Sequence, residues 1–158
     1  RFWPCKRKGL QAVQDAQREE SQKAAGRLTY AFANADVPKV TVVIGEAYGS
    51  AYVTMNSKSI GADIVYAWPD AKIGMMDAAA AVKIMYAEEI SASDKAAALI
   101  SEKAAEYEAL QSSAAAAAGR GYVDDIIKAD ETRQRVIAAF EMLFTKREGR
   151  PSRKHGTV

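Results

Sequence analysis

The chain has 158 residues, of which 49% are hydrophobic and 27% charged, which is typical of one globular domain with its own core and excludes a disordered or fibrous chain. Its one cysteine, Cys5, excludes an internal disulfide, and one histidine beside it is too few for a zinc site, so we expect no metal and a reducing cytoplasm. The net charge is +2, but the basic residues gather at the two ends and the middle of the chain is acidic. This distribution argues against nucleic-acid binding, which needs a basic face on the folded part.

The N-terminal third of the chain predicts a helix followed by a strand. Residues 10–33 carry apolar side chains at helical spacing, and Val37-Pro38 ends the helix because proline disfavours helix in the residue before it. The run Lys-Val-Thr-Val-Val-Ile at residues 39–44 is nearly continuously apolar. That pattern is typical of a strand buried on both faces, so we expect it at the centre of a sheet.

A glycine-containing turn at residues 45–49 leads into a predicted helix over residues 50–60, which ends at Gly61. The side chains expected to face the core are Ala51, Met55 and Ile60.

The remaining elements alternate, which is typical of the α/β class. Strands are expected at residues 64–68, 72–76 and 122–127, and helices at 77–86, 91–110, 114–118 and 130–145. The last helix should bury the stripe Val136, Ile137, Phe140 and Leu143. No apolar stretch reaches the ~18 residues that span a bilayer. Because the chain starts at Arg1 without an initiator methionine, we expect it to be the interior of a longer polypeptide.

The junction at residues 47–52, Ala-Tyr-Gly-Ser-Ala-Tyr, is the main candidate site. The first N–H groups of a helix have no internal partner, and the helix dipole adds positive charge there, so this end can hold an oxyanion. A merely structural turn is the alternative reading. Ser50 is not expected to be a nucleophile, because the lone histidine, His155, lies in the C-terminal tail.

Several motifs resemble those of one enzyme family. They are VPKVTVVI at residues 37–44, AYGSAYVTMNSK at 47–58, GADIVYAWP at 61–69 and RGYVDDII at 120–127, in that order. Together they resemble the C-terminal half of a biotin-dependent acyl-CoA carboxyltransferase subunit. The type is that of propionyl-CoA carboxylase beta or of methylmalonyl-CoA and glutaconyl-CoA decarboxylase alpha. The resemblance implies a crotonase-like fold of repeated ββα units with a C-terminal helix.

This resemblance also divides the chain and assigns site residues. Residues 1–27 match poorly and form a helical segment, residues 28–145 form a partial C-terminal carboxyltransferase domain, and residues 146–158 form a basic extended tail. The N–H groups of Ser50 and Ala51 would form the oxyanion hole for the ureido oxygen of biotin. Substrate-binding positions would be Tyr48, Gly49 and Val53, of which Val53 matches a position that influences acyl-chain choice.

The implied cofactor is biotin on a partner carrier domain, with acyl-CoA as the substrate. Expected partners are the biotin carboxyl carrier domain, further copies in a homo-oligomer and, for a decarboxylase, a membrane subunit. The family's first domain is absent, so the isolated chain should be inactive. Two rivals stay open: a noncatalytic oligomerisation module of such a complex, and an ordinary acyl-CoA hydratase or isomerase. A second crotonase-like domain upstream in the gene would favour the carboxyltransferase over the module.

Overall fold

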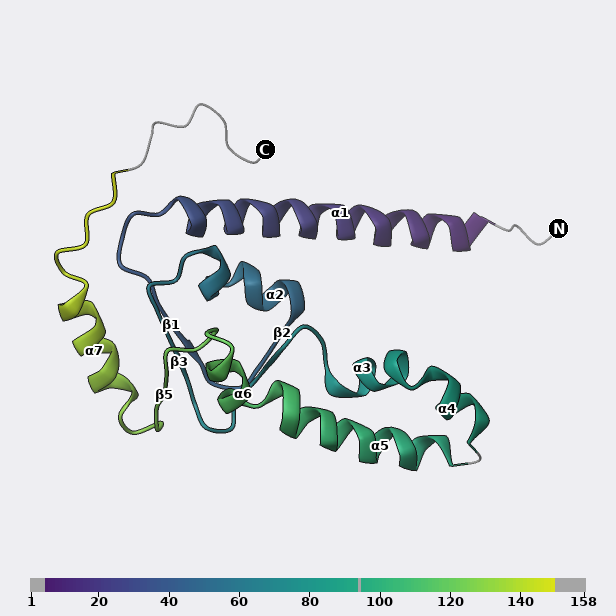
Figure 1. The fold of residues 1–158 in the computed structure, drawn as a ribbon. Coiled ribbons are helices and arrows are strands. Elements are labelled where there is room, and N and C mark those ends of the chain that lie inside the picture. Colours follow the sequence, from purple (N-terminus) through teal and green to yellow (C-terminus); the bar gives the residue numbers. More distant parts are fainter. Residues whose placement is uncertain (1–4, 94, 150–158) are drawn as a thin grey trace.

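The computed structural model describes residues 5–93 and 95–149, with side chains from Arg18 onward. Helix α1 (Cys5–Asn34) confirms the expected first helix and ends at the expected place. Its C-terminal part lies along helix α2 (Gly49–Thr54), while its N-terminal part extends beyond α2 (Figure 1).

Five short strands form two parallel sheets. The larger sheet has the order β1 (Val40–Val43), β3 (Ile64–Ala67), β5 (Asp125–Ile126), and the smaller pairs β2 (Glu46–Tyr48) with β4 (Lys72–Gly74). The prediction that residues 39–44 form the central strand is therefore wrong, because β3 lies between β1 and β5. β1 is an edge strand, most of its residues are only half-buried, and the following Ile44 is 56% exposed.

Strand β3 is buried on both faces because its side chains alternate between two apolar clusters. Val65 and Ala67 join the cluster that contains residues of β4 and of helix α6 (Ala114–Gly119). Ile64 and Tyr66 join the opposite cluster, which includes Ala139 of helix α7 (Thr132–Met142). One strand thus ties both layers of the core together.

The helix expected over residues 50–60 is broken. α2 ends at Thr54, and a separate 3₁₀ turn, η1 (Lys58–Ile60), follows and ends at the left-handed Gly61. Between them Asn56 has φ +64°, and its side-chain amide donates to the hydroxyl of Thr41 at 3.0 Å. The core positions expected for this helix are wrong: Ala51 is exposed, Met55 is 62% exposed and Ile60 is only half-buried.

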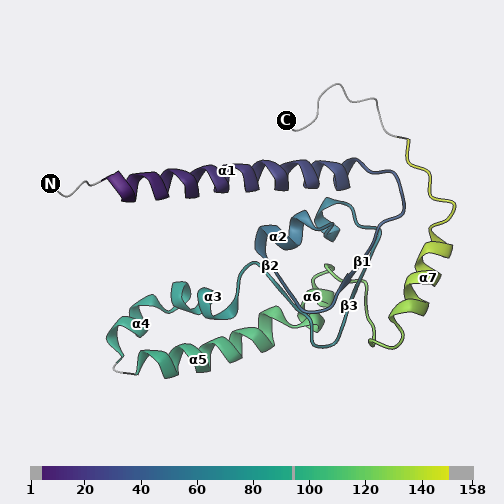
Figure 2. The same cartoon turned by 180° about the vertical axis from the view of Figure 1, so that it is seen from behind.

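A helical arm extends away from the strands (Figure 1; Figure 2). It consists of α3 (Ala78–Met85), α4 (Ala87–Ala92) and α5 (Ala96–Tyr107), and the π-helical turn η2 (Glu108–Ser112) joins it to α6. The single helix expected over residues 91–110 is thus two helices and a π turn. The alanine run does form a helix, and the hydroxyl of Ser113 caps it by accepting the N–H of Ala116 at 3.2 Å.

Helix α7 packs through only part of the expected stripe: Val136 and Leu143 are half-buried, whereas the other two side chains of that stripe are exposed. Ala139 is buried and Leu143 packs beside it, whereas Ile137 is 49% exposed and Phe140 45%. The prediction relied on the largest apolar side chains of the helix. The small side chain of Ala139 instead lets the helix approach the sheet. None of the helices in residues 5–93 and 95–149 combines the length and apolar character of a membrane span.

Asp63 joins three distant segments at the start of β3. Its carboxylate accepts the backbone N–H of Lys39 at 2.7 Å and the ammonium of Lys146 at 2.8 and 2.9 Å. Burial alone would lower the pKa of Lys146, but hydrogen bonds to Asp63 and Glu148 outweigh it and raise that pKa. The expected basic tail therefore begins with Lys146, which forms an ion pair with Asp63 within the fold. Residues 150–158 of that tail lie outside the described residues.

We expect Lys146→Met to lower the free energy of unfolding at neutral pH by ~2 kcal/mol, because hydrogen bonds between charged groups are lost at a side chain only 10% exposed. The pKa of Lys146 is raised in the fold, so its contribution is complete below the ordinary value of 10.5 and is lost as pH rises through the folded value. Urea unfolding of both proteins across this range should show the difference shrinking. Lys23→Met, which removes an exposed ion pair, is the control and should cost less than ~1 kcal/mol.

Candidate functional site

The candidate site begins where strand β2 turns into helix α2. Gly49 makes this turn with φ +61°, a left-handed conformation that other residues adopt only with strain. A Cβ atom at this position would lie 3.1 Å from the carbonyl oxygen of Met75, which follows β4. The turn therefore needs glycine for two reasons, backbone conformation and close contact.

The turn leaves two N–H groups at the start of α2 without partners. Tyr48, the residue before the helix, forms no side-chain cap. Among the described residues outside helices and strands, no backbone hydrogen bond uses the N–H of Ser50 or Ala51. Both residues are exposed. The arrangement can bind an acceptor oxygen, because uncapped N–H groups and the helix dipole lie at the same end.

Three hollows surround α2. The inner cavity, about 200 Å³, lies between α2, β4 and α6. The strand hollow, about 340 Å³, lies beside β1 and β2, and the helix hollow, about 380 Å³, lies between α1 and α2. The expected site residues divide among them. Gly49 and Val53 line the inner cavity, Tyr48 and Ala51 the strand hollow, and Ser50 and Ala51 the helix hollow.

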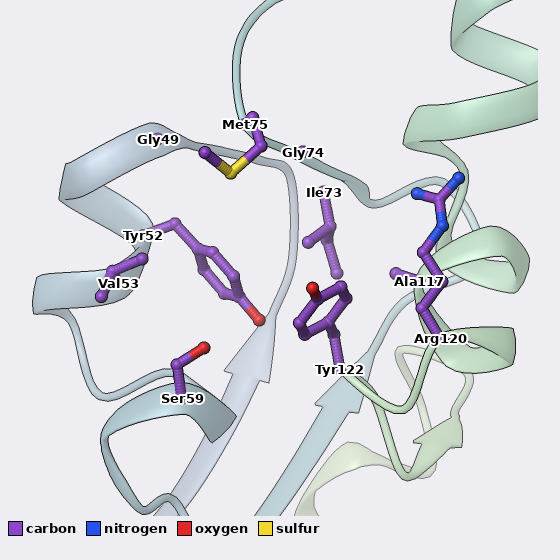
Figure 3. A pocket seen from close by; sticks show the side chains of 10 residues that line it. All are labelled: Gly49, Tyr52, Val53, Ser59, Ile73, Gly74, Met75, Ala117, Arg120 and Tyr122. Atoms are coloured by element: carbon purple, nitrogen blue, oxygen red, sulfur yellow. The ribbon is translucent and has the colours of Figure 1, made fainter.

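The inner cavity also contains residues that the sequence did not indicate. Figure 3 shows Tyr52 and Val53 on one side and Ala117, Arg120 and Tyr122 on the other. Tyr52 belongs to the junction at residues 47–52 that the sequence indicated, although no role was assigned to it. The other three come from a segment far along the chain, and no local pattern links them to α2.

The hydroxyl of Tyr52 is buried and has no hydrogen-bond partner among the described residues. Burial raises the pKa of Tyr52, and the nearby Tyr122 adds to the shift. The phenol is therefore neutral at physiological pH and can act as a hydrogen-bond donor or acceptor, but not as a base.

Charged residues lie on the other side of the β2–β4 pair. Lys72 forms an ion pair with Glu108, and the hydrogen bond to that carboxylate raises the pKa of Lys72. Burial raises the pKa of Tyr48, and the carboxylates of Glu46 and Glu108 raise it further. In the described part of the chain, no group of three or more histidine, cysteine, aspartate or glutamate side chains could hold a metal ion. The hollows around α2 are lined mainly by uncharged residues, apart from Glu46 at the strand hollow and Arg120 at the inner cavity.

The chain is similar to a known domain over nearly all of its length. The family model of the carboxyl transferase domain matches residues 8–158. A putative propionyl-CoA carboxylase beta chain of Bacillus subtilis is 50% identical over 132 residues, which cover 84% of this chain and 26% of the relative. The methylmalonyl-CoA carboxyltransferase 12S subunit of Propionibacterium freudenreichii is 44% identical over 130 residues, covering 82% of this chain and 25% of the relative.

Solved structures show the same similarity. A crystal structure of transcarboxylase 12S, described as a hexamer assembly with methylmalonyl-CoA bound, matches with a TM-score of 0.80 and 42% identity, over 85% of this chain and 26% of the other. The beta subunit of geranyl-CoA carboxylase from Pseudomonas aeruginosa shares the fold, with a TM-score of 0.68 at 23% identity over 90% of this chain and 28% of the other. The crotonase-like α/β fold expected from the motifs is confirmed. The chain spans about a quarter of the length of the relatives it matches.

We expect Gly49→Ala to lower the free energy of unfolding by at least ~1 kcal/mol, because the new Cβ meets the Met75 carbonyl and the backbone is left-handed. Gly45→Ala, four residues earlier, is the control. A Cβ there meets nothing within 4 Å, so its effect should stay within ~0.5 kcal/mol. Chemical unfolding of the three proteins measures this, and equal effects at both glycines would contradict the strained turn.

We expect Tyr52→Phe to leave the free energy of unfolding unchanged or raise it by up to ~1 kcal/mol, because it removes a buried hydroxyl that has no partner. Thr41→Val is the opposite case. The Thr41 hydroxyl donates to the Asn56 carbonyl at 2.8 Å and accepts from its amide, so its removal should cost ~1–2 kcal/mol. Thermal unfolding of both variants distinguishes the two hydroxyls, and a clear loss in Tyr52→Phe would mean that this hydroxyl has a partner.

Proposed function

The chain belongs to the carboxyl transferase domain family, and from this membership we propose that it supplies the biotin side of a carboxyltransferase active site. The proposed reaction is carboxyl transfer between biotin and an acyl-CoA. The relatives include carboxylases, a carboxyltransferase and decarboxylases, so the class of reaction is common to them while its direction differs.

One observation carries the proposal. After the left-handed turn at Gly49, helix α2 starts without a side-chain cap, and its exposed residues Ser50 and Ala51 lie beside two hollows. Each hollow is larger than the ~150 Å³ cavity that is known to admit benzene, so a small cyclic urea fits beside these donors. The donors are neutral and so is a urea carbonyl, which makes the chemistry of the site fit biotin.

When bound, biotin on its carrier domain supplies the ring nitrogen that carries and releases the carboxyl group. The N–H groups of Ser50 and Ala51 would hold the ureido oxygen by donating hydrogen bonds, and they would stabilise negative charge on that oxygen. Because the helix fixes these donors before the reaction, they stabilise the charge without reorganising. Only the backbone of Ser50 is needed for this role.

The other assigned residues support this arrangement. Tyr48 and Gly49 form the turn that aims the N–H groups, and Val53 lies on the same helix facing the inner cavity. We propose that Val53 contributes to acyl-group selection. The part of the family's length that this chain does not span would hold the rest of the active site, so we expect no turnover from these 158 residues alone.

The proposed partners follow from the same reaction. They are a biotin carboxyl carrier domain, acyl-CoA, other copies of the chain and, in a decarboxylase, a membrane subunit. We propose a cytoplasmic location. One observation favours assembly as a second role: the arm and the adjoining turn η2 expose large apolar side chains, among them Ile84 at 68%, Met85 at 63% and, in η2, Leu110 at 65%. Assembly through the arm is compatible with catalysis.

The test compares two substitutions of Ser50 in a carboxyltransferase that contains this chain. Ser50→Pro removes one N–H donor at a helix start, where proline is tolerated, and we expect carboxyl transfer to fall by ~10²–10³-fold. Ser50→Ala keeps the N–H and removes only the hydroxyl, so its rate should stay close to that of the wild type. Circular dichroism verifies that both variants are folded. Unchanged transfer in a folded Ser50→Pro variant would falsify the role of this N–H.

A further inference from the structure

The inner cavity is built as a site for a hydrocarbon group. Its walls include the side chains of Val53 from α2, Ile73 from β4 and Ala117 from α6, with the rings of Tyr52 and Tyr122 between them (Figure 3). Ile73 is 4% exposed and Ala117 only 1%, so the deepest walls belong to the apolar core. Met75 at 79% and Tyr122 at 45% are exposed and form its outer part.

The cationic group at this cavity is already engaged. Arg120 donates to the backbone oxygen of Gln111 at 3.0 Å and also to its side-chain oxygen. The guanidinium is therefore held toward the π turn η2 and is a poor partner for an anionic ligand. Apart from the hydroxyls of Tyr52, Ser59 and Tyr122, the remaining lining is apolar. An uncharged apolar group suits it, because such a group loses water contact without leaving a charge unpaired.

The size of the cavity limits the group. An apolar cavity of ~150 Å³ admits benzene, so about 200 Å³ has room for a group of ~six carbon atoms or slightly more. Val53 and Ala117 lie on opposite sides of this space (Figure 3). A larger side chain at either position would fill it.

We propose that the inner cavity takes the uncharged hydrocarbon end of an acyl group of up to ~six carbons, and that the small side chain of Ala117 sets this length limit. The identification of the hydrocarbon as an acyl end rests on the proposed function. The cavity begins at Gly49 and Val53, so its occupant lies on the opposite side of α2 from the helix hollow.

The first experiment tests the cavity without any enzymatic activity. Benzene is titrated into the protein while the methyl signals of Val53, Ile73 and Met75 are followed by NMR. We expect saturable shifts in the wild type and their loss in Ala117→Leu. Ala115→Leu makes the same change on an exposed position of the same helix and should keep the shifts.

A second filling variant guards against misfolding of Ala117→Leu, since overfilling a core is destabilising. Val53→Phe fills the cavity from a half-buried position on α2 and should also abolish the shifts, read at Ile73 and Met75. Absence of saturable shifts in the wild type, or their persistence in both folded filling variants, would overturn the proposal.

The second experiment tests the acyl assignment in a carboxyltransferase that contains this chain. We expect Ala117→Leu to lower kcat/KM for hexanoyl-CoA at least ~10-fold more than for propionyl-CoA, since each misplaced methylene in an apolar pocket costs ~10-fold or more. An equal change for both substrates would overturn the role of Ala117. Absence of transfer with every acyl-CoA in the wild type would instead overturn the proposed function and the acyl assignment, while the benzene result would still stand for the cavity.

Discussion

The left-handed backbone of Gly49, in contact with the carbonyl of Met75, is the constraint on which the whole site depends. It reverses the chain between β2 and α2 within one residue, so the helix starts beside the end of its own strand. The first N–H groups of the helix are left outside the core, while Val53, one turn later, faces inward. An ordinary side chain at this position would strain the turn and separate these two features.

Helix α2 has only six residues, yet it borders three hollows. Its first backbone N–H groups lie beside the helix hollow, and the side chains of Tyr52 and Val53 line the inner cavity. A short helix can therefore present polar donors on one side and an apolar wall on the other. A longer helix is not needed, because the useful groups are those of the first turn. The break at Asn56 is therefore compatible with the site, and the hydrogen bonds to Thr41 hold the chain in place after it.

The sequence predicted the elements whose signals are local. Helix α1, strand β3 and the alanine helix α6 follow from spacing, from an apolar run and from a serine cap. The position of β1 at an edge could not be predicted, because strand order depends on partners elsewhere in the chain. The end of α2 was missed for a similar reason: Asn56 bonds to Thr41, 15 residues earlier. At the site, the Gly49 turn was identified, whereas the wall formed by Ala117 and Tyr122 arises only through folding.

The two contacts of the Asp63 carboxylate can form only at different times during synthesis of the chain. The carboxylate accepts the N–H of Lys39, which precedes it, and the ammonium of Lys146, which follows 83 residues later. During synthesis on a ribosome, the first contact can form before Lys146 is available. The second must wait until the segment after α7 has left the exit tunnel. The nascent chain thus keeps a partly satisfied acidic group at the base of its central strand until translation reaches that lysine.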